Sequence, residues 1–84
     1  MNTLATSLDF DENTMWVNLA DGRRLGIPLA WFPRLLNASP EERLHFEISG
    51  GGKGLHWDGL DEDISVAGLL AGQGDATRPV EHVA

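Results

Sequence analysis

The fold of this chain of 84 residues is decided by the stretch MWVNLADGRRLGI at residues 15–27. Its first half alternates between apolar and other side chains, and this period of two is typical of a half-buried β-strand. The alternating apolar residues are Met15, Val17 and Leu19. Asp21-Gly22 is a strong signal for a tight turn, and residues 23–27 supply the returning strand. The stretch therefore predicts a β-hairpin. Trp16 points to the opposite face from Met15 and Val17, so either another part of the protein covers it or it lies on the surface.

A further strand precedes this hairpin, because residues 4–10 show the same alternation. The residues that share one parity are Leu4, Thr6, Leu8 and Phe10. The connection at residues 11–14 is rich in turn-forming residues. Pro28 ends the last strand, since proline cannot donate a backbone hydrogen bond to a continuing ladder. We therefore predict a three-stranded antiparallel meander.

Short helices and a fourth strand are predicted after the meander. In residues 29–37, helical spacing places Trp31 with Leu35, and Phe32 with Leu36. The sequence Ser39-Pro40-Glu41-Glu42 is typical of a helix start, in which Ser39 and Glu42 form a capping box. Alternation resumes at residues 44–48 and predicts the fourth strand. Brief extended segments are expected at residues 55–57 and 64–66, followed by a helical turn.

The predicted fold class is α+β, with a small antiparallel sheet and one or two short helices packed on it. The sheet comprises the N-terminal meander plus the fourth strand. A chain of 84 residues is enough for one domain and too short for two. We assign residues 1–72 to this single domain. The pattern then becomes polar, so residues 73–84 are predicted to be a flexible C-terminal tail.

The composition is acidic, with 13 Asp and Glu residues against six Lys and Arg, for a formal net charge of −7. Binding of a phosphate backbone depends mainly on Lys and Arg, so no direct nucleic-acid partner is expected. An acidic balance instead favours a basic protein partner. The other explanation for such a charge is that it confers solubility alone.

Compartment and assembly are predicted from what the sequence lacks. No stretch approaches the roughly 20 apolar residues that a membrane-spanning helix needs. The N-terminus has no secretory signal, and the chain has no cysteine. We therefore expect a cytoplasmic protein with no membrane partner. An exposed edge strand would also allow a homodimer.

The sequence contains no catalytic motif. Residues 50–54, GGGKG, resemble a phosphate-binding loop, but Ser or Thr does not follow the lysine, so a flexible connector is expected. There is no cysteine nucleophile and no Gly-x-Ser-x-Gly elbow. We assign no catalytic, cofactor-binding or metal-binding residue, and we do not expect an enzyme.

Two segments provide candidate binding residues. Trp31 near Arg34, and Trp57 between His56 and Asp58, combine residue types that are enriched at interaction hot spots, although a core position is the better interpretation for either tryptophan alone. The acidic run at residues 61–63 could bind a metal with His56, but its spacing matches neither a calcium loop nor a zinc motif. Three consecutive acidic residues are more often a solvated turn, or a helix start that negative charge stabilises. The candidate interaction surface comprises Trp31, Arg34, His56, Trp57, Asp58, Asp61, Glu62 and Asp63.

Several ordered blocks together resemble a known family. They are Asp21-Gly22-Arg23, Ile27-Pro28-Leu29 with Trp31 and Pro33-Arg34-Leu35, Glu41-Glu42-Arg43, Gly54-Leu55-His56-Trp57, and LDEDISV at residues 60–66 with Leu69-Leu70. Over roughly residues 4–72 the chain resembles the small bacterial family known as domain of unknown function 2442. The resemblance implies an α+β fold with a small antiparallel sheet.

The resemblance also implies two kinds of role. Some family members are encoded beside another small protein, which implies toxin–antitoxin-like pairs. Others carry an added helix-turn-helix domain, which implies regulation or ligand sensing. This chain has no room for that second domain, so DNA binding by that route is not expected.

Two functional hypotheses follow. The first is a non-enzymatic protein-interaction module, the acidic and antitoxin-like partner of a small basic protein. The alternative is a small-ligand or metal-binding sensor domain that uses the segment from His56 to Asp63.

Overall fold

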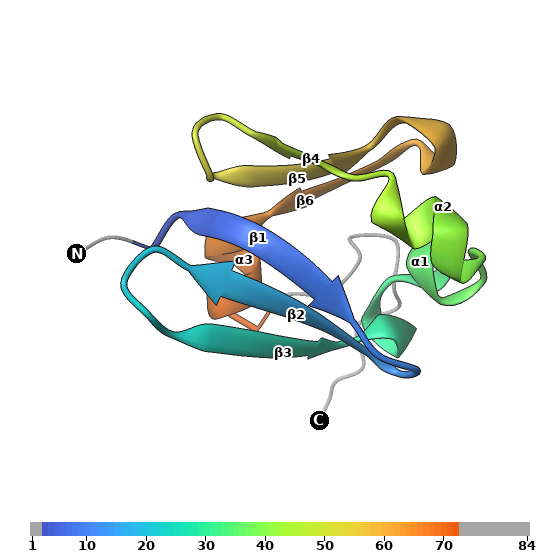
Figure 1. Cartoon of the computed structure of the whole chain (residues 1–84), viewed down its shortest axis with the longest axis horizontal. Coiled ribbons are helices and arrows are strands. Elements are labelled where there is room, and N and C mark those ends of the chain that lie inside the picture. Colours follow the sequence, from blue (N-terminus) through green and yellow to red (C-terminus); the bar gives the residue numbers. More distant parts are fainter. Residues whose placement is uncertain (1–2, 73–84) are drawn as a thin grey trace, which may run out of the picture.

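The computed structural model describes residues 3–72, which form two antiparallel sheets of three strands each that face each other (Figure 1). The first sheet contains, in spatial order, β1 (Ala5–Phe10), β2 (Thr14–Leu19) and β3 (Arg24–Pro28). The second contains β4 (Glu47–Ser49), β5 (Gly54–Trp57) and β6 (Glu62–Ser65). The predicted α+β class is confirmed. The tail predicted at residues 73–84 lies outside the described residues.

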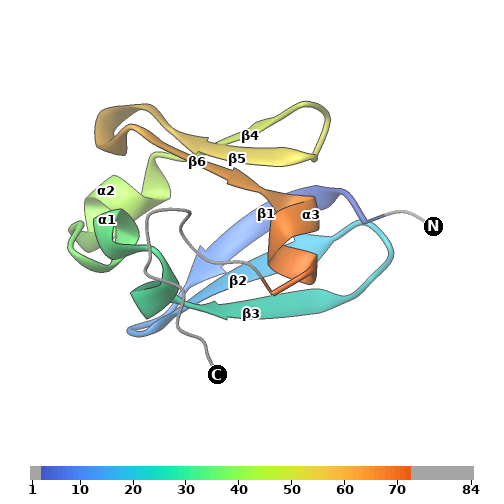
Figure 2. The ribbon, with the colours of Figure 1, turned by 180° about the vertical axis from the view of Figure 1, so that it is seen from behind.

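Short helices connect and flank the sheets. They are η1 (Leu29–Trp31), α1 (Pro33–Leu36), α2 (Pro40–Leu44), η2 (Asp58–Leu60) and α3 (Val66–Leu70), of which η1 and η2 are 3-10 turns. The helices α1 and α2 lie together at one end of the molecule, whereas α3 lies beside the sheets towards the other end (Figures 1 and 2). None of them is long and apolar enough to cross a membrane within residues 3–72.

The predicted meander is present, and its second turn forms as its sequence indicates. Gly22 has a φ of +93°, which glycine adopts without a Cβ clash. The Leu19 amide donates to the Arg23 carbonyl over 2.8 Å and closes the turn. The carboxylate of Asp21 accepts hydrogen bonds from the backbone and side chain of Arg23.

Strand β1 departs from the predicted alternation because it contains a bulge. Ala5 pairs with Leu19, but Ser7 pairs with Asn18, so Thr6 is an extra residue in the strand. Ala5 and Leu8 are therefore buried while Thr6 is exposed. The expectation that Thr6 shares the apolar face was wrong. An extra residue in a strand shifts the alternation, so side chains before the bulge point to the opposite face from the one expected.

The fourth strand joins a second sheet instead of extending the meander. Three successive glycines with positive φ, at residues 50–52, turn the chain back on itself directly after β4. As a result β4 pairs with β5, and β5 pairs with β6. The strand is also shorter than predicted, because Leu44 belongs to α2 and the extended region begins only at Glu47.

The start of α2 follows the sequence signal. Ser39 Oγ accepts a hydrogen bond from the Glu42 amide over 3.0 Å, and Glu42 Oε1 accepts one from the Ser39 amide over 2.8 Å. The predicted capping box is confirmed. Residues 29–37 differ from prediction, because Phe32 is extended and interrupts the helix. Phe32 and Leu35 are therefore the pair that is buried.

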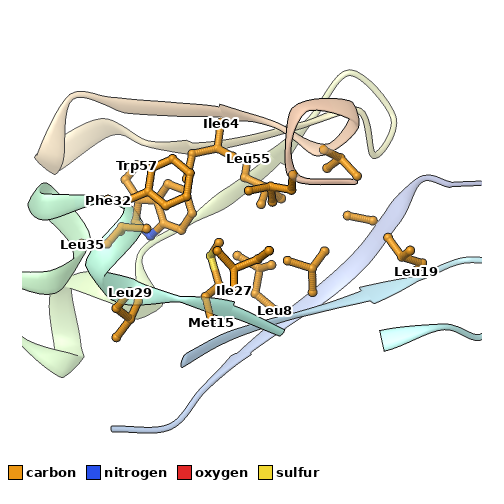
Figure 3. Packing of buried hydrophobic residues seen from close by; sticks show 14 residues of the cluster. Leu8, Met15, Leu19, Ile27, Leu29, Phe32, Leu35, Leu55, Trp57 and Ile64 are labelled. Atoms are coloured by element: carbon orange, nitrogen blue, oxygen red, sulfur yellow. The ribbon is translucent and has the colours of Figure 1, made fainter. Parts of the chain in front are cut away.

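Both sheets contribute to one hydrophobic core, which lies between them (Figure 3). Met15, Leu8 and Ile27 point into it from the first sheet, and Leu55, Ile64 and Trp57 from the second. Phe32 and Leu35 close the core at the end where α1 and α2 lie. Of the three tryptophans, Trp57 is fully buried and the other two are partly exposed.

Trp16 lies on the outer face of the first sheet and is covered by other residues of the chain. The guanidinium carbon of Arg24 lies 4.7 Å from the centre of the Trp16 ring, a cation–π arrangement. The indole Nε1 donates to Asp11 Oδ2 over 3.0 Å. Gly26 leaves room for the ring, since a Cβ there would lie 2.6 Å from Trp16 Cζ3. Trp16, which has the opposite parity to the core residues of its strand, is therefore partly covered by Arg24 and Asp11.

Candidate functional site

Trp57 is a core residue, which corrects its assignment to the candidate interaction surface. Its side chain is 0% exposed and packs near Phe46, with ring centres 6.5 Å apart. The indole Nε1 donates to the Arg43 carbonyl over 2.9 Å, so its polar atom is satisfied inside the protein. Trp57 is placed on the inward side of β5 because it alternates with His56, and it cannot contact a partner in this conformation.

Arg34 connects α1 to the segment that precedes β6. Its guanidinium donates to the Asp61 carbonyl, and Arg34 Nη1 lies 3.8 Å from Glu62 Oε1. Asp61 has a φ of +53°, in the left-handed region that non-glycine residues rarely adopt. Glu62 is only 6% exposed, so its placement on the candidate surface was wrong. Arg34 therefore braces a strained turn, while the Asp61 side chain remains exposed.

His56 lies between two carboxylates, in a group that we call the His56 cluster: His56, Asp58 and Asp63. His56 Nδ1 lies 2.7 Å from Asp63 Oδ1, and Nε2 lies 3.6 Å from Asp58 Oδ1. The hydrogen bond to Asp63, assisted by its charge and by Asp58, raises the pKa of His56 above its ordinary value despite partial desolvation. Both carboxylates are largely exposed. Within residues 3–72, no three histidine or acidic side chains converge in a way that could hold a metal ion.

The structure thus divides the predicted surface into separate groups. Trp31 is half-buried and packs against the margin of the core. Arg34 contacts the Asp61–Glu62 segment, and the His56 cluster is held on β5, η2 and β6. The exposed polar residues of these groups bond mainly to one another. The predicted residues therefore do not form one continuous contact surface.

The end of the molecule formed by α1 and α2 exposes apolar side chains that local sequence patterns did not reveal. Among the described residues, Leu44 (61% exposed) and Leu36 (43%) are the exposed large apolar side chains. They belong to α2 and α1, which lie together in Figure 1. None of the α2 residues, Pro40–Leu44, is buried. The capping signal at Ser39 could have revealed Leu44 as a helical residue, but its alternation with Phe46 and Ile48 favoured a strand.

A hollow of about 270 Å³ lies beside Leu44, between the β1–β2 turn and α2. Its lining residues are Phe10, Asp11, Glu12, Pro40, Arg43 and Leu44, and we call it the hairpin groove. Phe10, Pro40 and Leu44 give it an apolar surface, whereas Asp11 and Glu12 lie on the turn side. The groove is therefore an apolar hollow with carboxylates on one wall.

The charges around the hairpin groove have defined partners. Asp11 Oδ1 accepts hydrogen bonds from the Asn13 and Thr14 amides, and Oδ2 accepts one from Trp16. These bonds, chiefly that from Trp16, lower the pKa of Asp11 below its ordinary value. The guanidinium of Arg43 donates to the carbonyls of Leu35 and Leu36, at 2.8 and 2.9 Å. The positive side chain in the groove is thereby directed to the end of α1.

A capping box within α2 and two contacts with other segments fix this helix. Its N-terminus is closed by the capping box, the Arg43 side chain binds the carbonyls at the end of α1, and the Arg43 carbonyl accepts the Trp57 indole N–H. Two of these contacts are made by the residue that immediately precedes Leu44. Because these hydrogen bonds fix the position of α2, they also leave the side chain of Leu44 exposed.

A smaller hollow of about 150 Å³ lies between the end of α2 and η2. It is lined by Glu42, His45, Trp57, Asp58, Gly59 and Leu60, so it includes two residues of the predicted surface. Pockets that enclose small-molecule ligands commonly measure about 300–1,000 Å³. This hollow is below that range and would accommodate only part of such a ligand.

Comparison with known proteins gives two similar structures. A crystal structure of a protein of unknown function from Rhodospirillum rubrum ATCC 11170 is 33% identical, with a TM-score of 0.77, and the match covers 88% of this chain and 92% of that one. A solution structure of an uncharacterized protein from Chromobacterium violaceum is 29% identical, with a TM-score of 0.75, and the match covers 88% of this chain and 70% of that one. No curated protein matches the chain.

The family assignment rests on a match that covers most of the chain. Residues 5–75 match the model of the family described as Protein of unknown function (DUF2442). This is the family that the ordered sequence blocks predicted. The chain therefore belongs to the DUF2442 family.

Proposed function

We propose that this protein is a non-enzymatic interaction module, the acidic partner of a small basic protein. The observation that carries the proposal is Leu44, which is 61% exposed on a tethered helix beside a groove bordered by carboxylates. The chain as a whole has a formal net charge of −7. An apolar contact with acidic residues beside it, on an acidic protein, fits a partner that combines apolar and basic side chains.

The exposed leucines would supply binding free energy. Burial of a leucine side chain is worth roughly 1.5–3 kcal/mol relative to leaving it in water. A single exposed leucine is ordinary in a monomeric protein. Here, however, Leu44 and Leu36 lie on two adjacent helices, and Leu44 borders a hollow. Because α2 is already held in place, little conformational entropy would be lost when a partner covers Leu44.

The negative charge would increase the rate of association with a basic partner and the selectivity for that partner. Opposite charges on two partners accelerate their encounter and disfavour partners of like charge. Salt screens such interactions over distances of about 10 Å at 0.1 M ionic strength, so association should weaken as salt increases. The form of pairing that we favour is an antitoxin-like complex in the cytoplasm, which rests on the family resemblance and is an analogy.

The experiment that tests the proposed function is affinity capture from a lysate of the source organism at low and moderate salt, with mass spectrometry of the retained proteins. We expect one stoichiometric basic protein whose recovery falls at the higher salt concentration. Absence of a retained partner at both salt concentrations would contradict the proposal.

The alternative, a ligand sensor that uses the segment from His56 to Asp63, has one supporting observation. Polar groups of Glu42, His45 and Asp58 border the smaller hollow, which has Trp57 in its lining. Its volume of about 150 Å³ makes this the second candidate. A thermal-shift screen with small ligands and divalent ions tests it, because a ligand that binds only the native state raises Tm.

A further inference from the structure

The hairpin groove has an apolar surface with acidic residues on its β1–β2 turn side, and α2 carries a further acidic residue near Leu44. Phe10, Pro40 and Leu44 supply the apolar surface. Asp11 and Glu12 border it on the β1–β2 turn. On α2, Glu41 precedes Leu44 by three residues, and residues at this spacing are neighbours on a helix surface. The three acidic residues, Asp11, Glu12 and Glu41, outnumber the single guanidinium of Arg43, which donates to backbone carbonyls.

The complement of such a surface is an apolar row with positive charges beside it. We propose that the hairpin groove is the docking site for a basic amphipathic helix of the partner, with one large apolar side chain inserted beside Leu44 and Phe10. This inference rests on the proposed function and specifies its site and the chemistry of its occupant. Helix-in-groove recognition uses apolar anchors on one face, and Lys or Arg beside them would meet Glu12 and Glu41.

The walls of the groove favour a helix over an added β-strand. An added strand requires a row of backbone groups available for a ladder. The walls here are a tight turn and a short helix whose backbone groups bond within the chain. The Asp11 amide donates to the Thr14 carbonyl, and the His45 amide donates to the Glu42 carbonyl. Side-chain packing of an amphipathic helix therefore suits the groove better than strand addition.

Charge argues against a second copy of this chain as the occupant. A two-fold dimer through the groove would place the same surface patch on both sides of the interface. Glu12 and Glu41 of one copy would then face the carboxylates of the other, and like charges opposed across an interface are unfavourable. A basic partner helix replaces that repulsion with attraction.

The test uses the full chain and synthetic peptides as defined probes. The main probe is a peptide of about 18 residues, or five helical turns, with leucine at helical spacing on one face and lysine elsewhere. One control peptide replaces each lysine with glutamate, and a second keeps the lysines but replaces each leucine with serine. Binding is followed by ¹H–¹⁵N NMR titration, which reports the amides that shift and the Kd.

Matched variants locate the site. Leu44→Ser removes the apolar anchor at an exposed position, where we expect the fold to tolerate it. Glu12→Lys reverses one charge in the groove, and Asp58→Lys makes the same reversal at an exposed residue of the His56 cluster. We expect Leu44→Ser to raise the Kd about tenfold or more, as for a central anchor. Glu12→Lys should raise it several-fold, and Asp58→Lys should leave it nearly unchanged.

Support requires that the lysine–leucine peptide shifts the amides around Phe10, Glu12 and Leu44, and that both control peptides bind much more weakly. Shifts confined to another surface, equal binding of the lysine–serine peptide, or no binding would overturn the groove assignment. A dimer of the chain alone that Leu44→Ser dissociates would also overturn it, since a second copy would then occupy the groove. A basic protein captured equally by wild type and Leu44→Ser would refute the docking site while leaving the proposed function standing.

Discussion

Two regions of this protein carry large apolar side chains away from the core. The regions differ in whether other residues of the chain cover those side chains. On the outer face of the first sheet, Trp16 is covered by Arg24 and its indole N–H is bound by Asp11. At the end formed by α1 and α2, Leu44 and Leu36 are exposed. On the outer face, other residues of the chain cover Trp16. At the α2 end, hydrogen bonds fix the helix backbone while the side chains of Leu44 and Leu36 remain in water.

The polar residues around Trp16 form a connected network. Asn18 Nδ2 donates to Ser7 and Asp9, and Arg24 donates to both Asn18 Oδ1 and Asp9. At the α2 end, the hydrogen bonds of Arg43 and Trp57 instead fix the backbone that precedes Leu44. The outer face is thus covered by residues of the chain itself, whereas the α2 end leaves Leu44 and Leu36 exposed, and we propose that a partner covers them.

The largest expected effect comes from removing the support beneath Leu44. Trp57→Ala should cost about 3–5 kcal/mol of the free energy of unfolding, because it empties a fully buried site. In a small domain this is a large share of the total stability. Urea denaturation followed by circular dichroism measures it. A loss below about 1 kcal/mol would show that the core does not depend on Trp57 and would weaken the comparison.

A smaller loss is expected from crowding the covered tryptophan. Gly26→Ala would place a Cβ 2.6 Å from Trp16 Cζ3, in a ring held by Arg24 and Asp11. We expect a loss of about 1–3 kcal/mol, typical of overpacking. Gly59→Ala is the matched control, since nothing lies within 4 Å of its added Cβ. Equal urea midpoints for the two variants would mean that Trp16 is loosely held.

A still smaller effect on stability is expected at Leu44 itself. Leu44→Ser should change the free energy of unfolding by no more than about 0.5 kcal/mol, as for an exposed residue outside the core. Leu35→Ala, at a fully buried leucine of α1, should cost about 2–5 kcal/mol. Thermal and urea denaturation compare the two. A large loss at Leu44 would make that residue structural and would remove the contrast between the regions.

The smallest effect concerns the His56 cluster, another polar group completed within the chain. Asp63 raises the pKa of His56 above its ordinary value of 6.5, so the protonated form is favoured in the folded state. The resulting stabilisation is fully present below pH 6.5 and is lost as pH rises through the folded pKa. NMR titration of His56 should show a higher pKa than in the Asp63→Asn variant. An unchanged pKa in that variant would mean that the pair is not formed in solution.

Local sequence signals predicted much of the fold. The Asp21-Gly22 turn, the capping box at Ser39 and the extended segments near residues 55 and 64 all form as expected. The turn and the capping box depend on contacts within a few residues. The bulge at Thr6 and the separation into two sheets depend on long-range pairing instead. Neither leaves a local pattern that distinguishes it from a regular strand or a single sheet.

The candidate site was harder to predict for the same reason. The sequence left Trp57 open between core and surface and placed Leu44 in a strand, because the position of α2 decides the environment of both side chains. The Trp57 indole reaches a carbonyl 14 residues away, on the residue just before Leu44. Strand alternation placed Leu44 with Phe46, whereas the helix extends through Leu44 and leaves its side chain in solvent. Burial at this end is set by packing between distant segments.

The most direct test of the account places a photo-crosslinking amino acid at Leu44, and in a matched variant at Thr6, an exposed residue of β1. Both proteins are expressed in the source organism, irradiated, and their crosslinked peptides are sequenced by mass spectrometry. The account predicts that the probe at residue 44 captures one basic protein through a lysine- or arginine-rich amphipathic segment, and that the probe at residue 6 does not. Crosslinks to the same proteins from both positions, or none from residue 44, would contradict the claim that Leu44 is an uncovered docking residue.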